Sequence, residues 1–389
     1  MATLPLELLP SWKLGESVPG SLHVSLRAHD WRDLASQESI ARWDSLAQRA
    51  SEPNPFHESW YLLPALRAFD PGGTAKLLCL EANGFLAGLL PVVHSASYYD
   101  HPVPHLANWR HANAFLGAPL VAKGFEHAFW RELLAWCDAQ PGGPLFLHLA
   151  QLPEAGPLHE ALGEVMADDR RQDAVVRREV RAALESDLAP EAYFEESLSG
   201  KKRKELRRQH RRLAEEGELT VHRTAGAEDL EEWTEEFLAL ERAGWKGEAG
   251  SALACDARTA GVFRDALAGA ADRGRVERLA IRLDGRPLAM LATFLSPPGA
   301  FGFKTAFDET YARFSPGVLL QRENLAILSH PDIAWTDSCA AQDHPMIDHF
   351  WRERRIVTRR NIAIGGKARR LLFRALAARE TRSTSKGNP

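Results

Sequence analysis

Two hairpin patterns placed 201 residues apart constrain the fold of this 389-residue chain more than any other feature. In AKLLCLEANGFLAGLLPVV two apolar runs meet at Asn83-Gly84, and in RLAIRLDGRPLAMLATF they meet at Asp284-Gly285. Asn-Gly and Asp-Gly favour two-residue turns between paired strands. A helical stretch precedes each hairpin, and a strand and a helix follow each. Single turns of this kind also arise by chance, so the shared order of elements is the stronger argument for one plan present twice.

The repeat predicts an α/β (α+β) fold of two tandem domains, each a mixed twisted sheet flanked by helices. A length of 389 residues fits two domains. We expect an irregular lead-in over residues 1–20, a first domain over 21–175, a second over 176–378 and a disordered tail over 379–389. The boundary is expected between about Asp168 and Pro190.

Composition and charge exclude several classes of protein. A net charge of −4 gives no global attraction to nucleic acid, so no DNA partner is expected. The four cysteines lie far apart without a C-x-x-C pair, so we expect no metal site and no redox dithiol. The start, MATLPLELLPSWKLGES, lacks the pattern of a signal peptide, and no apolar run approaches the ~20 residues of a membrane helix. These features predict a cytoplasmic protein.

The run KKRKELRRQHRRL, residues 201–213, carries eight Lys and Arg in its first twelve positions. Leu198, Leu206 and Leu213 recur near one face of a helix, which leaves a wide basic face for solvent. The run therefore predicts the opening helix of the second domain. Two alternatives stay open: a nucleic-acid contact, or a contact of Lys204 or Arg208 with an anionic substrate.

The strand FGFKTAF leads through a polar loop to Ser315-Pro316-Gly317 and an apolar helix. Ser315 is suited to cap this helix, and Pro316 to be its first residue. A helix N-terminus beside a cleft favours an anion, because free N–H groups and the helix dipole point there. Plain capping without a ligand is the alternative.

The next predicted strand ends at Asp337-Ser338-Cys339, and a loop with His344 follows. Asp337 is a candidate general base, or a group that orients one. His344 has a pKa suited to proton transfer near neutrality, although Asp343-His344-Pro345 is also typical of an ordinary turn. Cys339 is more typical of a small buried residue than of a nucleophile.

Trp245 and Lys246 interrupt an acidic helical stretch within ERAGWKGEAGSAL. A Trp among glycines is poor helix material, so we expect a loop there. This loop either lines a pocket, with Lys246 meeting an anionic group, or is a surface turn.

Taken in order, LSGKKRKELRRQHRRLAEEGELTV, GWKGEAGSAL, DGRPLA, FKTAFDETYARFSPGVLL and TDSC…DHPMIDHFWRERR resemble the CelD-type branch of the GNAT N-acyltransferase superfamily. That branch is related to the FemAB-like double-GNAT proteins. The resemblance covers residues 198–364, and the first half matches only in layout, as a degenerate GNAT copy.

This resemblance implies direct attack of an amine on an acyl-CoA thioester held between two splayed strands, with no covalent intermediate and no metal. The donor's pyrophosphate would lie at the loop from Arg313 to Val318. This sequence departs from the family there, because Pro316 and Val318 stand where glycines are usual and Pro316 has no N–H to donate.

Two further basic residues take their roles from the resemblance. FemAB-like relatives use aminoacyl-tRNA as donor, and Arg352 in FWRERR falls where such a relative has a basic residue that supports the reacting group. Lys304 would face the cleft from the central strand, although a lysine on a strand is as often on the solvent side.

Three functions follow as hypotheses. The first is an N-acyltransferase that uses acetyl-CoA or another acyl-CoA and acts on an amino group of a small molecule or sugar. The second is a FemAB-like transferase that depends on aminoacyl-tRNA, for which tRNA would be a partner. The third is a non-catalytic GNAT-fold protein in polysaccharide biosynthesis. Sequence does not name the acceptor or the oligomeric state.

Overall fold

The computed structural model describes residues 23–384 apart from 142, 343, 345 and 349. The first half of the chain begins with a strand and two helices, continues with four consecutive strands, and ends with helices and strands in alternation. They are β1 (Val24–Asp30), α1 (Gln37–Gln48), α2 (Ser59–Phe69), β2 (Lys76–Ala82), β3 (Phe85–Ser95), β4 (His105–Asn108), β5 (Leu120–Val121), α3 (Glu126–Ala139), β6 (Phe146–Pro153), α4 (Pro157–Asp168) and β7 (Asp173–Leu184).

The second half follows a similar order after two connecting helices, α5 (Pro190–Ser197) and α6 (Gly200–Ala214). Its elements are β8 (Leu219–Ala225), α7 (Leu230–Ala243), α8 (Trp245–Glu248), α9 (Ala257–Ala271), β9 (Val276–Leu283), β10 (Arg286–Ser296), β11 (Gly299–Phe307), α10 (Pro316–Asn324), β12 (Trp335–Asp337), β13 (Glu353–Ala363) and α11 (Lys367–Thr384). Short 3-10 turns are η2 (Trp31–Leu34), η3 (Pro55–His57), η4 (Leu253–Cys255), η5 (Glu309–Phe314) and η6 (Leu325–Ser329).

The two predicted hairpins are present at equivalent places in the two halves. Asn83 and Gly84 join β2 to β3, and Asp284 and Gly285 join β9 to β10. All four residues have positive φ, between 46° and 84°, as a two-residue turn of this hand requires. The predicted fold class, two tandem units with mixed sheets and flanking helices, is confirmed.

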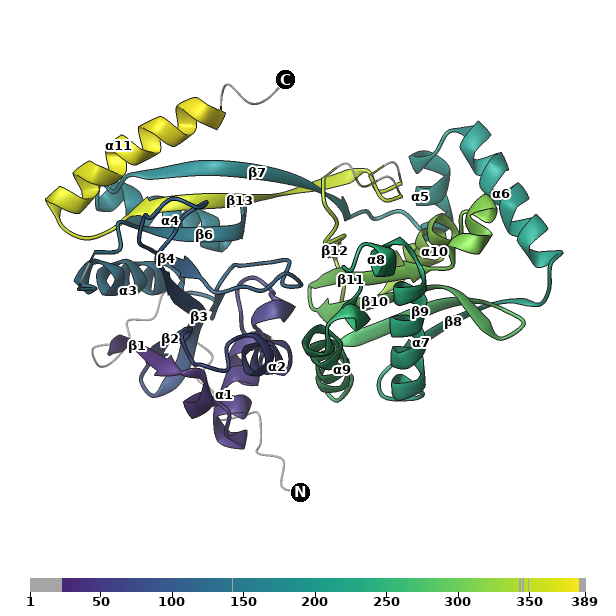
Figure 1. The fold of residues 1–389 in the computed structure, drawn as a ribbon, viewed down its shortest axis with the longest axis horizontal. Coiled ribbons are helices and arrows are strands. Elements are labelled where there is room, and N and C mark those ends of the chain that lie inside the picture. The colour runs from purple at the N-terminus through teal and green to yellow at the C-terminus, as the bar shows by residue number, and fades with distance from the viewer. Residues whose placement is uncertain (1–22, 142, 343, 345, 349, 385–389) are drawn as a thin grey trace.

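The two halves share one sheet of 13 strands in the order β1-β2-β3-β4-β6-β13-β7-β12-β11-β10-β9-β8, with β5 paired to β3. Strand β13, the last of the second half, lies between β6 and β7. Strand β7, the last of the first half, pairs in turn with β12 of the second half. Figure 1 shows β7 and β13 running side by side between the two ends of the molecule. Each half therefore completes its sheet with a strand from the other.

The expected domain limits fall on particular elements. The division at 175–176 lies inside β7, which belongs to both sheets by its pairing, so no linker separates the halves. The lead-in over residues 1–20 lies outside the described residues. The expected tail from residue 379 differs from the structure, because α11 continues to Thr384. Its sequence, KARRLLFRALAARETRST, is rich in strong helix formers.

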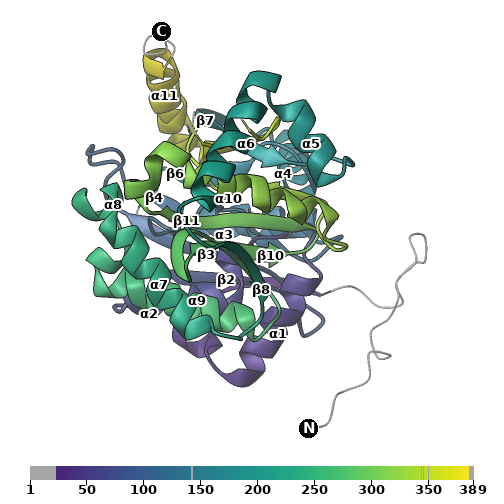
Figure 2. The same ribbon diagram turned by 90° about the vertical axis from the view of Figure 1, so that its right-hand side faces the viewer.

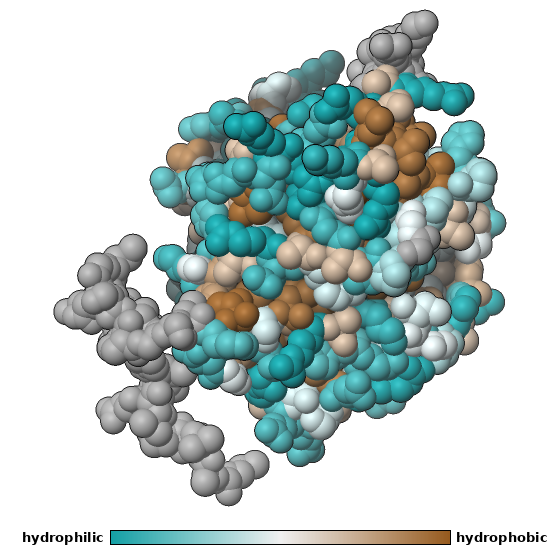
Figure 3. Space-filling view, turned by 90° about the vertical axis from the view of Figure 1, so that its left-hand side faces the viewer, coloured by the Kyte–Doolittle hydropathy of each residue, from teal (hydrophilic) through white to brown (hydrophobic). Residues whose placement is uncertain are grey.

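Helix α11 projects from the end of the molecule that the first half builds (Figure 2). Phe373 anchors it and is 2% exposed, whereas Leu371 and Leu372 face outward. Figure 3 shows that this end is largely hydrophilic, with hydrophobic residues gathered near the C-terminal end of the chain. Of the helices that the structure describes, α11 included, none is long and apolar enough to cross a membrane.

The basic run forms α6, as the spacing of its leucines predicts. Ser199 caps the helix by accepting a hydrogen bond from the Lys202 N–H, and Leu206 and Leu213 are buried. Lys201 and Lys204 are exposed on the opposite face. Gln209 turns inward and donates to the Ser315 hydroxyl, 3.2 Å away, so α6 covers the loop before α10.

The halves also share a hydrophobic core. Phe56, just before α2, lies among Phe294, Phe301 and Phe303 of the second half, at centroid distances of 6.0–6.4 Å. Helix α2 packs closely on α9, where a Cβ at Gly269 would lie 2.8 Å from the Trp60 Cβ. Burying aromatic side chains contributes about 2 kcal/mol each, so this shared cluster strongly opposes separation of the halves.

Arg181 on β7 ties the two halves together by polar contacts. Its guanidinium donates to the Phe115 carbonyl oxygen at 2.7 Å and to the Gln151 side chain, both in the first half. It also lies 3.7 Å from the Asp337 carboxylate at the end of β12. Arg181 is 4% exposed, so these contacts replace the water that a guanidinium would otherwise bind.

We expect Arg181→Met to lower the free energy of unfolding by about 3 kcal/mol, because it leaves the buried Asp337 carboxylate without its nearer cation. Urea denaturation would measure the loss. Arg178→Met is the matched control: Arg178 lies on the same strand with a side chain 58% exposed and pairs with Glu154, so a change below about 1 kcal/mol is expected. Equal losses in the two variants would contradict a linking role for Arg181.

Candidate functional site

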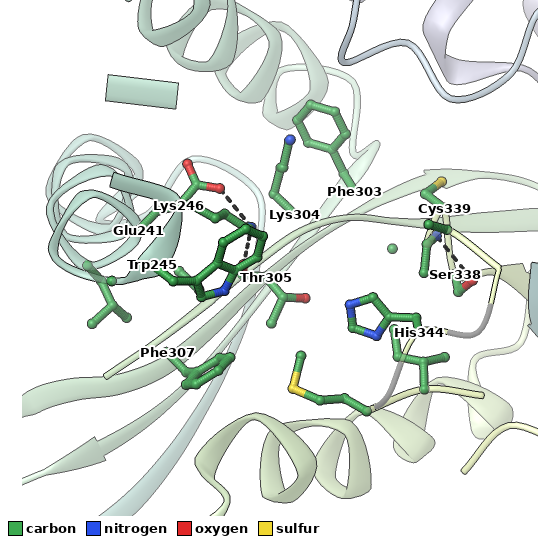
Figure 4. A pocket seen from close by; sticks show the side chains of 18 of the residues that line it. Glu241, Trp245, Lys246, Phe303, Lys304, Thr305, Phe307, Ser338, Cys339 and His344 are labelled. Carbon is green, nitrogen blue, oxygen red and sulfur yellow. Dashed lines mark hydrogen bonds and ion pairs between the residues drawn. The ribbon is translucent and has the colours of Figure 1, made fainter. Parts of the chain in front are cut away.

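The candidate site is the place where two central strands separate. Strands β11 and β12 pair in parallel from Gly299–Trp335 to Phe301–Asp337, and the pairing stops there. Strand β11 continues to Phe307, and no described strand pairs with residues 302–307 on that side. A cavity of about 690 Å³ opens beside this free edge (Figure 4).

Asp337 makes the turn that separates the strands. Its Oδ1 accepts a hydrogen bond from the Cys339 N–H at 2.8 Å, and Cys339 has a φ of 52°. A short acidic side chain that bonds to the backbone two residues on is typical of a turn. The chain after β12 thus leaves the sheet, and the edge of β11 stays open.

A bulge in β11 places two consecutive side chains on the same side. Ala292 of β10 pairs with Lys304, but Thr293 pairs with Gly302, so Phe303 is an extra residue. The Phe303 ring lies 6.0 Å from the Phe115 ring, and Lys304 Nζ lies 5.4 Å from the same ring. In a regular strand neighbouring side chains point to opposite faces, so the bulge brings Lys304 into the cavity beside Phe303.

The walls of the cavity come from four parts of the chain. They are the end of α7 with α8, the bulged strand β11, the loop after β12, and a segment of the first half. The polar or aromatic residues among them are Phe115, Glu241, Trp245, Lys246, Phe303, Lys304, Thr305, Phe307, Glu309, Ser338, Cys339 and His344.

The structure brings the predicted residues Trp245 and Lys246 into this wall. Lys246 Nζ forms an ion pair with Glu241 at 2.9 Å and donates to the Thr305 carbonyl oxygen at 3.0 Å. The Trp245 side chain is 54% exposed at the cavity rim, and its backbone N–H donates to Glu309. The charge of Lys246 is therefore neutralised, and the lysine fastens α8 to β11.

Lys304, also predicted, has a different environment. Its Nζ lies near the Phe115 and Phe303 rings, and across the described residues it has no hydrogen bond or ion pair. Burial lowers the pKa of Lys304 to about 8, and the nearby Glu241 carboxylate opposes that shift. A partly buried ammonium whose nearest neighbours are aromatic faces is available to a ligand.

His344 and Cys339 line the opposite part of the cavity. Burial lowers the pKa of His344, with Asp348 opposing the shift, so the imidazole is neutral at pH 7. Its buried Nδ1 has no hydrogen-bond partner in the part of the chain that the structure describes. Burial raises the pKa of Cys339 well above its usual value, so this residue is a thiol and not a thiolate nucleophile. Asp343 and Pro345 lie outside the described residues.

Two predicted catalytic residues do not reach the cavity. Asp337 is fully buried, with Oδ2 3.7 Å from Arg181 and 3.9 Å from Arg355. Arg352 lies at the surface and pairs with Glu196 at 2.8 Å. The buried position of Asp337 is physically explained by the turn it makes and the two cations beside it, which suits a positioning residue.

The loop from Arg313 to Val318 also differs from a simple anion site. Arg313 pairs with Glu216, and Ser315 adopts a left-handed conformation, with a φ of 54°, instead of the extended one usual for a cap. Pro316 begins α10, and the Val318 N–H already donates to the Ser315 carbonyl oxygen. A Cβ at Gly317 would lie 2.6 Å from Met346 Sδ, a residue of the cavity wall. The loop thus borders the cavity but offers few free N–H groups.

The corresponding gap in the first half is filled. Gln151 lies within β6, beyond the part of that strand that pairs in parallel with β4, and is left-handed like Cys339, with a φ of 58°. There, however, the Asn108 amide bonds to both backbone groups of Ala150 at 2.9 Å and to the Gly117 carbonyl oxygen at 3.0 Å. Of the two equivalent gaps, the structure therefore leaves that of the second half open.

Several residues of the site carry no sequence signal. Phe115 comes from the first half, and Glu241 and Glu309 are ordinary acidic residues of helical segments. Only the pairing of strands across the halves brings Phe115 to the cavity. The sequence does not predict the bulge at Phe303 either, because FGFKTAF has the pattern of a regular strand.

Comparisons with known proteins agree with this architecture. Residues 200–344 match the family model of an acetyltransferase (GNAT) domain. The structure of FemX has a TM-score of 0.52 at 10% identity, over 87% of this chain and 98% of its own. A conserved protein of unknown function from Bacteroides thetaiotaomicron has a TM-score of 0.54 at 10% identity, over 84% and 97%. No curated protein shows significant similarity to the chain.

The comparisons show a GNAT domain in residues 200–344 and a fold shared with FemX over most of the chain. At 10% identity the likeness to solved structures concerns the fold alone. The GNAT part of the predicted resemblance is confirmed, and the CelD-type branch stays a prediction.

The environment of Lys304 predicts a pH-dependent cost in stability. Because its pKa falls from 10.5 to about 8, the folded protein binds the proton less tightly than the unfolded chain. The cost is fully present below about pH 8 and is relieved as the pH rises towards 10.5. Lys304→Met should therefore be more stable than the wild type at pH 7, by roughly 2–3 kcal/mol.

Urea denaturation at several pH values would measure this difference, which should shrink between about pH 8 and 10.5. Lys202→Met, at an exposed position on α6, is the matched control and should show no pH-dependent difference. A Lys304→Met variant that is no more stable at pH 7, or whose advantage grows with pH, would contradict a desolvated ammonium.

Proposed function

We propose that this chain is an N-acyltransferase that moves an acyl group from acyl-CoA to an amino group of a small-molecule or sugar acceptor by direct attack. The observation that carries the proposal is the open edge of β11, where pairing with β12 stops at Phe301–Asp337 beside a cavity of about 690 Å³. Its place within the matched residues 200–344 supports the same chemistry.

The open edge suits a thioester. Backbone N–H groups on an unpaired strand edge can donate to the thioester carbonyl oxygen and stabilise the negative charge that develops there. Gly302 leaves the entrance of the gap free of a side chain: a Cβ there would lie 3.4 Å from the Ser338 carbonyl oxygen. The wall includes the rings of Phe115, Phe303 and Phe307, which would limit the contact of water with a reacting carbonyl at the gap.

The transfer balances with the residues at hand. The acceptor nitrogen forms a bond to the carbonyl carbon, the C–S bond breaks, and its electron pair leaves on the coenzyme A thiolate, which takes a proton from solvent. His344 is our candidate for the base that removes the proton of the attacking amine, because its imidazole is neutral and its Nδ1 is unpartnered. Asp337 acts through the turn it holds, and no step requires Arg352.

The other end of the donor fits less well. Pyrophosphate would need several donors at the start of α10, but Pro316 has none and the Val318 N–H is already bonded. Arg313, two-thirds exposed and paired with Glu216, is a cation of this loop itself. We therefore expect weak recognition of the pyrophosphate, with most of the binding energy at the pantetheine and acyl end.

A second candidate function is FemAB-like transfer from aminoacyl-tRNA. The exposed basic face of α6, which covers the loop before α10, favours it. Within the described part of the chain, five cations of α6 form no ion pair: Lys201, Lys202, Lys204, Arg211 and Arg212. Binding of tRNA to such a face would fall steeply with salt. We propose the same two units, residues 21–175 and 176–378, for either function, with the chemistry in the second.

Calorimetric titration with acetyl-CoA and longer acyl-CoAs tests the donor. We expect binding to the wild type and at least about tenfold weaker binding to Gly302→Val, whose side chain would narrow the gap. Gly261→Val is the matched control, since a Cβ at Gly261 meets nothing within 4 Å. If no acyl-CoA binds, and charged tRNA shifts in a gel at low salt, the second candidate replaces the first. If neither binds, both transferase proposals fail and the non-catalytic hypothesis stands.

A further inference from the structure

The charged side chains of the cavity differ in whether they have an ion pair or a hydrogen bond. Lys246 and Glu241 neutralise each other at 2.9 Å, and Glu309 accepts the Trp245 N–H at 2.8 Å. Lys304 has neither an ion pair nor a hydrogen bond within the described chain. Charges withdrawn from water are usually paired in proteins. Lys304 is partly buried in the cavity wall and has aromatic rings as its nearest neighbours, so an anionic ligand would supply the partner that it lacks.

We propose that Lys304 binds a carboxylate of the acceptor, so that the natural acceptor is an amine that also carries a carboxylate, such as an amino acid or an amino-acid conjugate. That the ligand is the acceptor rests on the proposed acyl transfer. That the ligand carries a negative charge rests on the geometry of the cavity alone. It narrows the acceptor class, because a neutral amino sugar has no group for Lys304.

The surroundings favour a carboxylate over a phosphate. A phosphate dianion usually recruits several cations or N–H groups, whereas Lys304 stands between aromatic rings at 5.4 and 6.0 Å. The neighbouring Lys246 is already paired, and the Glu241 carboxylate beside it would repel a second negative charge. One ammonium in an apolar wall matches one singly charged anion of small size.

The position of Lys304 places binding of the acceptor carboxylate on one side of β11 and acyl transfer on the other. Figure 4 shows the Lys304 side chain extending beside Phe303 on one side of β11, with Thr305 and His344 on the other. A ligand whose carboxylate meets Lys304 would cross the open edge of β11 to place its amine near the thioester and His344. The spacing between amine and carboxylate is therefore a property that the site selects.

The protonation of Lys304 determines the pH range in which it can bind a carboxylate. The titratable groups around Lys304 are Glu241 and Lys246 from the α7–α8 wall, Cys339 from the loop after β12, and His111 from the first half. Because burial lowers the pKa of Lys304 to about 8, the ammonium is present at pH 7 and is lost in more alkaline solution. Carboxylate binding should weaken as the pH rises through that value.

The test uses ω-amino carboxylates from glycine to 6-aminohexanoate, and the primary alkylamines that match them without the carboxylate. Thermal unfolding of the full chain at pH 7 reports binding without any need for transfer, since a bound ligand raises Tm. We expect the carboxylates, at one preferred length, to raise Tm of the wild type by several degrees, and the alkylamines to raise it much less.

Three variants assign the effect. Lys304→Met should lose the carboxylate-dependent shift, Lys304→Arg should keep part of it, and Lys123→Met, at an exposed position of the first half, should behave as the wild type. Thiol release from acetyl-CoA then measures transfer, and kcat/KM should favour the best carboxylate over its alkylamine by at least about tenfold in the wild type only.

The outcomes separate the two proposals. Equal Tm shifts for carboxylates and alkylamines, or a carboxylate preference that survives in Lys304→Met, would overturn the role of Lys304. Transfer to alkylamines without that preference would leave the acyltransferase standing and remove this inference. A Lys304-dependent carboxylate shift with no acyl transfer to any amine would keep the binding site and count against the proposed function.

Discussion

The exchange of β7 and β13 is the constraint on which the rest of the structure depends. The two strands pair antiparallel from Glu353–Ala183 to Ile362–Asp173, and each also completes the sheet of the other half. Because β12 is only three residues long, its place in the sheet is set by β7 on one side and β11 on the other. The turn at Asp337, and with it the open edge of β11, therefore exists only when the first half is in place. Arg181 links these parts of the structure directly. Its guanidinium donates hydrogen bonds to the Phe115 carbonyl oxygen and the Gln151 side chain, and it lies 3.7 Å from the Asp337 carboxylate.

The two halves share one arrangement of strands, but the gap beside the parallel strand pair is closed in the first half and open in the second. After their short parallel strand pairs, both chains turn through a left-handed residue, Gln151 or Cys339. In the first half the Asn108 amide bonds across the gap to Ala150 and closes it. In the second half the equivalent gap opens into the cavity, whose wall includes Gly302, Lys304 and Ser338 besides apolar side chains. The segment that fills the first gap also carries Phe115 into the second. The closed half is thus part of the wall of the open one.

The sequence predicted the local part of this structure well and the rest poorly, for physical reasons. Hairpins at Asn83-Gly84 and Asp284-Gly285 depend on two residues each, so their pattern sufficed. The leucine spacing likewise predicted α6. Trp245, Lys246, Lys304 and His344 were predicted for the site and do line one cavity. Asp337 and Arg352 do not reach it, because a residue type at a strand end does not specify which way its side chain turns. Phe115 and Arg181 were not found at all, since their contacts join segments far apart in the chain.

The two lysines of the cavity show why position decides more than residue type. Lys246 and Lys304 are both near Glu241, yet only Lys246 reaches it, at 2.9 Å, because α8 carries the lysine past the edge of β11. The bulge at Phe303 turns Lys304 towards Phe115 instead, where its neighbours are rings. A methionine there would satisfy packing without the cost of desolvating an ammonium. The stability of the fold therefore does not explain a lysine at this position. A ligand with a negative charge does explain it, because the ammonium that destabilises the protein when the cavity is empty would stabilise the complex when the cavity is occupied.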